Sequence, residues 1–373
     1  MDNNKTTSSL KTAGSSCSCT PKSDAQPCNC LTDNIPRSAI LTITNKPTSE
    51  IRTTTGTLTF SNRLDHFLAR WGVNRMGHIV KPGLYRLGNP TPDSLVFVSA
   101  NYTLSFDAVR SALTGTDCYI LVLDTKGINV WCAAGKGTFG TDELVRRIGS
   151  IGLANIVRHR TLILPQLSAP GISAYEVQRQ SGFLVEYGPV RASDLSEYLK
   201  TRKATPEMRR VQFQLKDRIV LTPVELVHVV LPTIAAVIIL YFLAGPLAAL
   251  AVITTTLAGT VLFPALLPFI PTHDFSTKGL ILGEIIAIPF AVSFATNSTL
   301  PFLENALISL VLLLIMPALI AYLALNFTGC TTFTSRTGVK KEIFRYVPIM
   351  ALMLGSGIML SILLGIIKFM KVV

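Results

Sequence analysis

Charged residues are scarce in this chain, and their distribution is uneven. They make up 15% of the 373 residues, against about 25% in an average soluble protein, and the mean hydropathy is +0.45. Residues 220–373 hold 7 Lys and Arg and 5 Asp and Glu, whereas residues 1–219 hold the other 27 and 17. This composition argues against a wholly soluble protein and predicts a basic soluble half joined to an apolar membrane half.

Several motifs of common enzymes are missing. There is no Gly-x-x-x-x-Gly-Lys-[Ser/Thr] loop, because the sequence at 135–138 lacks the leading glycine at the required distance. No Gly-x-Gly-x-x-Gly follows the first expected strand, and no His-Glu-x-x-His is present. These absences argue against nucleotide hydrolysis, dinucleotide binding and zinc peptidase chemistry. The three histidines of the soluble half, His66, His78 and His159, are each expected to be structural.

The basic residues of the first half do not alternate with aromatic residues, as platforms for stacked bases would require. We therefore expect no nucleic acid partner. A basic domain joined to a membrane region suits the anionic inner leaflet or a polyanionic cofactor better.

Composition predicts four segments. Residues 1–36 read as a disordered tail, 37–205 as an α/β domain, 206–222 as a basic juxtamembrane linker and 223–373 as a transmembrane domain. The polar N-terminus lacks the apolar core of a signal peptide, so the soluble half is expected in the cytoplasm with reduced cysteines.

The tail contains two Cys-x-Cys pairs. A soft metal ion could bind there, and incidental thiols of a variable tail are an equally good interpretation. The candidate ligands are Cys17, Cys19, Cys28 and Cys30.

The α/β domain is predicted from strands that alternate with amphipathic helices, a pattern typical of a mostly parallel, Rossmann-like sheet. Thr141 is expected to cap one helix, whose Leu144, Ile148 and Ile151 fall on one face. The expected strands are 40–44, 56–60, 94–99, 118–124, 161–164 and 184–187. The expected helices are 62–71, 106–113, one from 141, 173–181 and 193–202.

Five segments of the second half are long and apolar enough to cross a bilayer as helices: 224–243, 246–269, 280–296, 303–325 and 346–367. The 326–345 loop carries four Lys and Arg, and the 297–302 loop carries none. The positive-inside rule then places the soluble domain and the 326–345 loop in the cytoplasm, so that the protein is a multi-pass inner-membrane protein. Glu284 lies within the third span, where a structural or protonated role is favoured over transport.

The most informative stretch is Asn129-Val130-Trp131-Cys132-Ala133-Ala134-Gly135-Lys136. It follows a buried-type strand and a Thr-Lys-Gly turn, and it places Cys132 where a helix of small residues can begin. The small residues leave little bulk around the sulfur, so a broad, flat group could approach. A thiol near a helix N-terminus with Lys136 nearby is expected to have thiolate character, the form that binds metals. On composition alone, a small core cysteine is the more common interpretation.

This octapeptide resembles the hallmark Asn-[Val/Ile]-Trp-Cys-Ala-[Ala/Gly]-Gly-Lys of the corrinoid proteins of microbial mercury methylation. The similarity extends over roughly 40–370, including Val80–Tyr85, Ser99–Tyr102, Leu162–Gln166 and Gly182–Arg191. The Asp-x-His-x-x-Gly signature of His-ligated cobalamin domains is missing, because Asp65 and His66 are adjacent. The soluble part of that family resembles the corrinoid domain of the corrinoid iron–sulfur protein of the acetyl-CoA pathway.

The resemblance implies a cobalamin-type cofactor bound with its own base displaced, with Cys132 as the lower axial cobalt ligand on a short cap helix. Residues 129–136 would shape that helix and its approach to the ring. The implied enzyme activity is corrinoid-dependent methyl transfer from Co(III) to thiol-bound Hg(II), which forms methylmercury. The implied partners are a methyltetrahydrofolate-dependent methyl donor and a two-cluster ferredoxin that reduces cobalt.

Three alternatives stay open. The first is a membrane-anchored corrinoid methyl carrier of one-carbon metabolism whose acceptor is not mercury. The second is a permease with a cytosolic metal-sensing domain, which predicts essential polar groups along the spans. The third is a structural membrane anchor, for which replacement of Cys132 would be silent.

Overall fold

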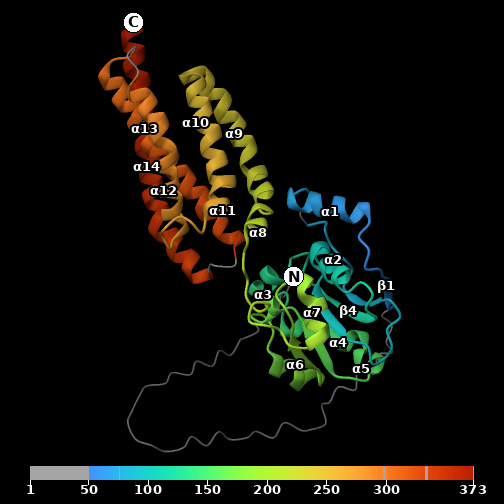
Figure 1. Cartoon of the computed structure of the whole chain (residues 1–373). Coiled ribbons are helices and arrows are strands. Elements are labelled where there is room, and N and C mark those ends of the chain that lie inside the picture. The colour runs from blue at the N-terminus through green and yellow to red at the C-terminus, as the bar shows by residue number, and fades with distance from the viewer. Residues whose placement is uncertain (1–49, 75, 297–299, 332–334, 373) are drawn as a thin grey trace, which may run out of the picture. The chain divides into compact units, whose positions relative to one another are not determined.

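The protein consists of an α/β domain followed by a helical region (Figure 1). The structure is a computed structural model, and it describes residues 50–74, 76–296, 300–331 and 335–372. The predicted strand at 40–44 and the cysteines of the tail lie outside these residues. The α/β domain contains one six-stranded sheet, and the helical region contains the five longest apolar helices of the described chain.

The strand order in the sheet is β1-β2-β4-β3-β5-β6. Four of the five pairings are parallel, as predicted, and the β2–β4 pairing is antiparallel. The strands are β1 (Arg52–Thr54), β2 (Gly83–Leu87), β3 (Val96–Ala100), β4 (Cys118–Leu123), β5 (Thr161–Leu164) and β6 (Leu184–Tyr187).

The chain changes direction across the sheet at β3. From β3 the chain passes to β4 on one side, and from β4 it crosses to β5 on the other side and continues to β6. Adjacent parallel strands whose connections lead in opposite directions leave a crevice outside their carboxyl ends, and ligands of open α/β sheets bind there. The topology therefore predicts a ligand site at the carboxyl ends of β3 and β5.

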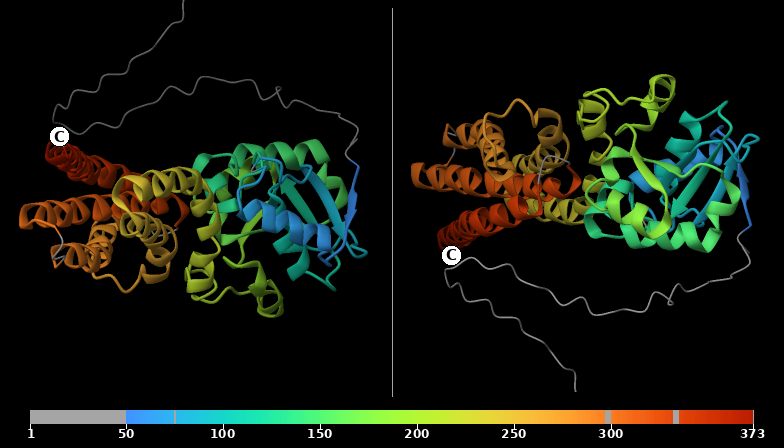
Figure 2. Two further views of the ribbon diagram at one scale, coloured as in Figure 1. Left: turned by 90° about the horizontal axis from the view of Figure 1, so that it is seen from above. Right: turned by 90° about the horizontal axis from the view of Figure 1, so that it is seen from below.

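Helices cover both faces of the sheet (Figure 2). Alternate residues of each central strand point to opposite faces, so Val96 and Val98 join one apolar cluster and Phe97 joins the other. The helices of this domain are α1 (Phe60–Arg70), α2 (Thr103–Ala112), α3 (Val130–Lys136), α4 (Thr141–Ile151), α5 (Leu153–Ile156), α6 (Ala174–Ser181) and α7 (Leu195–Thr201), with 3-10 turns η1 (Gln166–Ser168) and η2 (Ala192–Asp194). Clusters on both faces that bury large apolar side chains supply most of the driving force for folding.

Most predicted elements are present, and two local predictions are wrong. Residues 56–60 form no strand, because Thr59 and Asn62 make a reciprocal capping box and the helix α1 begins at Phe60. Thr141 does not cap α4, since Gly140 is the N-cap; the Thr141 hydroxyl instead accepts a hydrogen bond from the backbone N–H of Ser173. The buried face of α4 is as predicted, with Leu144, Ile148 and Ile151 inward.

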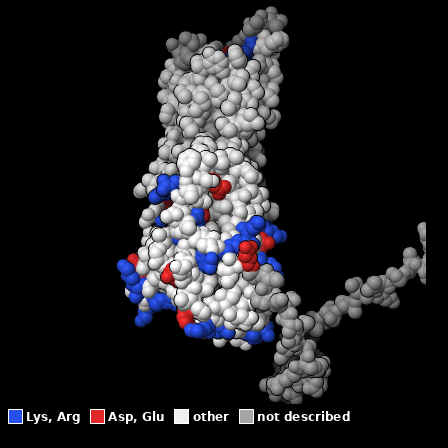
Figure 3. All heavy atoms as spheres, turned by 90° about the vertical axis from the view of Figure 1, so that its right-hand side faces the viewer, with Lys and Arg blue, Asp and Glu red and all other residues white. Residues whose placement is uncertain are grey.

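The helical region has five helices long and apolar enough to cross a membrane: 215–244, 246–266, 275–295, 302–327 and 337–370. On the face shown in Figure 3, charged side chains gather over the α/β domain, and the helical region carries few. The elements are α8 (Leu215–Ile219), α9 (Thr222–Ala244), α10 (Pro246–Leu257), η3 (Ala258–Leu262), α11 (Phe263–Leu266), α12 (Phe275–Ala295), α13 (Phe302–Phe327), η4 (Thr328–Cys330) and α14 (Arg336–Val372). All five predicted spans coincide with these helices. The first, third, fourth and fifth helices begin earlier than predicted, and the second ends at residue 266 instead of 269.

Two glycines set the packing of α12 against α13. A Cβ on Gly279 would lie 2.6 Å from the Cα of Ala321, and one on Gly283 would lie 2.4 Å from the Cα of Pro317. Glycines four residues apart allow two membrane helices to approach this closely. Glu284, the next residue, is half-buried in α12, and its functional role stays a prediction.

Candidate functional site

The octapeptide that carries Cys132 forms one short helix together with its N-terminal cap. Asn129 precedes α3, and its side-chain Oδ1 accepts a hydrogen bond from the backbone N–H of Cys132 at 2.9 Å. Gly137 ends the helix with φ at +83°, a left-handed conformation that glycine adopts without a steric penalty. Cys132 therefore lies in the first turn of a helix whose start and end are both encoded locally.

The two alanines of the motif face the protein interior. Ala133 and Ala134 are buried in the apolar cluster beneath α3. A Cβ on Gly171 would lie 3.0 Å from the Cα of Ala134 and 2.3 Å from the carbonyl oxygen of Phe139. These small residues let α3 and the 166–171 segment pack closely, so at 133 and 134 the expectation of open space for a flat ligand is wrong. Gly135 is exposed, and nothing lies within 4 Å of its Cβ position.

Two cysteine side chains can be compared within the described residues. Cys118, at the start of β4, is fully buried, and burial together with the negative charge of Asp117 raises its pKa to about 12. Cys132 is half-buried and free. Since thiolate is the form that binds metal ions, Cys118 stays a protonated core residue and Cys132 is the thiol that a ligand can reach.

A cavity of about 340 Å³ lies beside the start of α3. Asn129, Val130 and Trp131 line one side of it, while the ends of β3 and β5 line another. Further walls come from α2 and from the 189–192 segment after β6. The cavity is therefore at the crevice that the strand order marks, and its walls are mostly apolar.

Ser99 on β3 places a hydrogen-bonding atom at this cavity. Its side chain is fully buried, it lines the cavity, and its Oγ has no hydrogen-bond partner within the described residues. A buried hydroxyl without a partner costs roughly 1–3 kcal/mol. The cavity thus presents one unsatisfied hydroxyl to a ligand that is flat and mostly apolar.

Asn101 supports the loop that leads to α3, a role that sequence reasoning missed. It is buried, and its Oδ1 accepts hydrogen bonds from the backbone N–H groups of Thr125 and Gly127, both at 3.0 Å. Its Nδ2 donates to Asp124 at 3.3 Å. An asparagine directly after a mostly apolar strand was the available signal, because a buried amide requires several partners.

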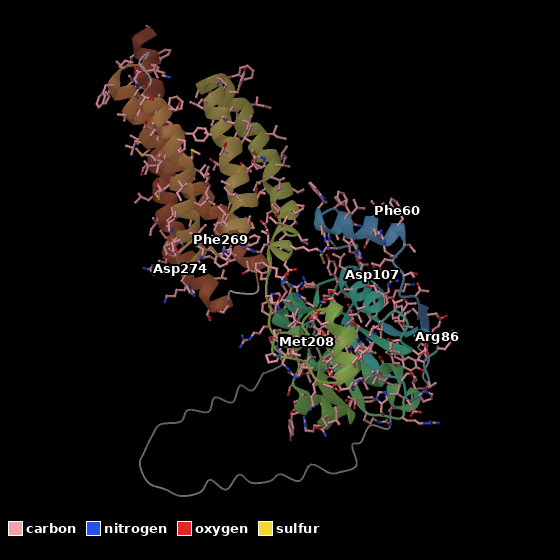
Figure 4. The ribbon with its side chains drawn as sticks, in the orientation of Figure 1. Phe60, Arg86, Asp107, Met208, Phe269 and Asp274 are labelled. Carbon is pink, nitrogen blue, oxygen red and sulfur yellow. The ribbon has the colours of Figure 1, made fainter. Side chains whose placement is uncertain are left out.

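The histidines of the α/β domain have hydrogen-bonded partners, as expected of structural residues. His66 pairs with Asp107 (labelled in Figure 4) at 2.8 Å, His78 pairs with Asp65 at 2.7 Å, and His159 bonds the carbonyl oxygen of Ser94. Within the described ranges no three His, Cys, Asp or Glu side chains cluster as ligands of a metal ion. The site is therefore built around one thiol and an apolar cavity.

Comparison with known proteins identifies relatives of the α/β domain. Residues 74–198, about a third of the chain, match the family described as CO dehydrogenase/acetyl-CoA synthase delta subunit. The acetyl-CoA decarbonylase/synthase complex subunit gamma of Methanopyrus kandleri is 33% identical over 123 residues, which are 32% of this chain and 26% of that protein. The corresponding subunit of Methanothermobacter thermautotrophicus is 28% identical over 185 residues, 44% of this chain and 40% of that protein. The chain thus spans between a quarter and two fifths of the length of these relatives, and the similarity covers the domain that holds Cys132.

Proposed function

We propose that this chain is a membrane-anchored corrinoid protein that transfers a methyl group to Hg(II), with Cys132 as the lower ligand of cobalt. The observation that carries the proposal is the position of Cys132. It is a half-buried, free thiol in the first turn of a capped helix, and the three residues before it, Asn129, Val130 and Trp131, line an apolar cavity at the switch point of the sheet. The resemblance of residues 129–136 to the mercury-methylation motif supports the choice of acceptor.

The residues around α3 fit a corrinoid. A sulfur donor suits a metal ion of intermediate softness, apolar walls suit the edge of a macrocycle, and the unpartnered Ser99 hydroxyl can bond a polar substituent. When bound, a methylated corrinoid supplies the methyl group and the cobalt centre that carries it.

The chain itself supplies orientation and electrostatics. The Asn129 cap and the buried Ala133 and Ala134 fix α3, so the Cys132 sulfur is held in one direction. Trp131 and Val130 line the cavity on the side of α3. Cys132 would hold the cobalt of a bound corrinoid through its sulfur, and an anionic sulfur donor would favour transfer of the methyl group as a carbanion equivalent. Hg(II), a soft electrophile, accepts such an equivalent, and it would arrive as a thiolate complex.

We also propose a location for the protein and two partners. The five apolar helices would anchor the protein in the cytoplasmic membrane, with the α/β domain on the cytoplasmic side. A methyltetrahydrofolate-dependent enzyme would supply methyl groups, and a two-cluster ferredoxin would reduce cobalt.

The full-length protein tests this function. Purified in detergent and loaded with methylcobalamin, it should form methylmercury from a Hg(II)–cysteine complex faster than free methylcobalamin does, as quantified by mass spectrometry. Cys132→Ala should reduce the rate to that of the free cofactor, whereas Cys118→Ala, which removes the buried thiol, should retain it. Equal rates for wild type and Cys132→Ala would refute the proposal.

The names of the relatives favour a second candidate. They belong to acetyl-CoA decarbonylase/synthase complexes, so a methyl carrier of one-carbon metabolism with a different acceptor is the main alternative. Both candidates require corrinoid on Cys132. Loss of the cofactor's methyl group at the same rate with and without Hg(II), in the presence of a candidate acceptor, would favour the alternative.

A further inference from the structure

A second cavity, of about 660 Å³, lies at one end of the helical region. Its walls come from four places: the segment around α8, the 267–274 loop, the first turn of α12 and the start of α14. Phe269 and Asp274, which mark the loop between α11 and α12, are labelled in Figure 4. The cavity is remote in sequence from the Cys132 site and is not used by the proposed methyl transfer.

Arg218 brings a buried positive charge to this cavity. The residue is 7% exposed, and its Nη1 donates to the carbonyl oxygens of Pro264 and Ala265, both at 3.1 Å. These carbonyls are at the end of α11, where helical partners are missing. The Nε of Arg218 is buried and has no partner within the described residues. The guanidinium therefore retains unused donor capacity.

Lys278 brings a second buried positive charge to the cavity. It is 9% exposed, lines the cavity from the first turn of α12, and its Nζ donates to the carbonyl oxygens of Leu267 and Ile270. Within the described residues, neither Lys278 nor Arg218 forms an ion pair with a carboxylate. Two buried cations whose protein partners are neutral carbonyls have no direct counterion in this part of the chain, and a bound anion would supply one.

The two carboxylates of the cavity are engaged elsewhere. Glu342 is 7% exposed and accepts a hydrogen bond from the backbone N–H of Ser276, at the N-terminus of α12, which favours a negative charge. Asp274 accepts from the hydroxyl of Tyr346 at 2.8 Å and contacts His273 at 3.3 Å. Both carboxylates thus have their own donors, and the two cations face the cavity without them.

We infer that this cavity binds a phosphate group through Arg218 and Lys278. A phosphate oxygen accepts charge-assisted hydrogen bonds from a guanidinium and an ammonium. Phe213, Leu267 and Phe275 also line the cavity, and they would contact an apolar portion of a ligand. The phosphate could belong to an anionic phospholipid or to a free phosphate ion.

Binding to the delipidated full-length protein distinguishes these sources. In an uncharged detergent, the melting temperature would be titrated with inorganic phosphate. In parallel, native mass spectrometry would count phosphatidylglycerol retained from nanodiscs of phosphatidylcholine with phosphatidylglycerol. Saturable binding of phosphate or of phosphatidylglycerol supports the site and shows whether its phosphate group comes from the free ion or from a lipid. Absence of saturable binding in both arms overturns the inference, and this result needs no variant.

Variants then test the two cations. Arg218→Gln and Lys278→Gln should each weaken binding by about tenfold or more, since each variant loses a charge-assisted hydrogen bond to the phosphate. Arg218→Lys, which keeps the charge, should bind more tightly than Arg218→Gln. The matched control is Lys341→Gln, which removes an exposed cation of α14 that does not line the cavity. Wild-type affinity in Lys278→Gln, or an equal loss in Lys341→Gln, contradicts the assignment. Cys132→Ala should bind phosphate normally, so the two proposals fail independently.

Discussion

The side chain of Asn129 holds the backbone of Cys132: the Asn129 Oδ1 accepts the N–H of Cys132 at 2.9 Å. This one hydrogen bond couples the start of α3 to the residue that carries the proposed ligand sulfur. Because α3 has only seven residues, its own hydrogen bonds are too few to hold it as an isolated helix. The cap and the packing of its alanines therefore determine where the thiol lies.

Asn129→Ala should loosen α3 without unfolding the domain. Loss of an N-cap side chain costs about 1 kcal/mol, and here the cost falls on one short helix. Hydrogen exchange of residues 130–137 should become faster, and the sulfur–cobalt absorption band should weaken. Asn129→Asp, which retains a capping oxygen, is the control. Unchanged exchange in Asn129→Ala would show that packing alone fixes the helix.

Gly171→Ala should push α3 away from the 166–171 segment that packs against it. The added Cβ would lie 2.3 Å from the Phe139 carbonyl oxygen and 3.0 Å from the Ala134 Cα, and relieving such overpacking costs about 1–3 kcal/mol. The melting temperature should fall and corrinoid binding should weaken. Gly149→Ala is the matched control, because nothing lies within 4 Å of that Cβ on α4, and it should stabilise the helix slightly. A Gly171→Ala variant as stable as wild type would contradict the close packing described here.

Acid should destabilise the protein partly through Asp65. Burial disfavours its charge, but hydrogen bonds from Thr103 and His78 outweigh that effect and lower the pKa of the carboxyl below its usual 3.8. A folded-state pKa below the unfolded value gives stability that is present above about pH 4 and lost as the pH falls through the folded pKa. The melting temperature of Asp65→Asn should therefore fall less steeply than that of wild type below pH 4.

Thr103→Val provides an intermediate case for the same measurement. It removes one of the two hydrogen bonds to Asp65, at 2.7 Å, and should reduce the acid dependence without abolishing it. Identical pH profiles for wild type and Asp65→Asn would show that other groups govern acid unfolding.

Alkylation should separate the two cysteines of the α/β domain. With a pKa of about 12, Cys118 is thiolate in roughly one molecule in ten thousand at pH 8, and it is also fully buried. Iodoacetamide should therefore label Cys132 and leave Cys118 unlabelled in the native protein, with both labelled in denaturant. Peptide mass spectrometry identifies the sites. Native labelling of Cys118 at the rate of Cys132 would contradict the burial.

The sequence was sufficient for elements with strong local signals. The apolar strands at 94–99 and 118–124 and the five spans are present because uninterrupted apolar runs have few alternatives. The wrong strand at 56–60 shows the limit of that reasoning. Its apolar alternation was real, but the Thr59–Asn62 capping box starts a helix there.

The cavity beside α3 could not be predicted in the same way. Ser99, Pro165 and Arg191 line it from segments many residues apart, and only the strand order brings these segments together. The sequence also does not show that the buried Ser99 hydroxyl lacks a hydrogen-bond partner among the described residues, because this depends on the three-dimensional packing. The octapeptide marked Cys132 from its residues alone, whereas the supporting role of Asn101 required the structure.

The most direct test of the account is the visible absorption spectrum of the full-length protein reconstituted with cobalamin, wild type beside Cys132→Ala. The account predicts bound cobalamin with a band shifted by sulfur ligation in the wild type, and loss of that shift in the variant while the protein stays folded. A folded wild type that binds no corrinoid, or a spectrum that does not change when Cys132 is replaced, would contradict it.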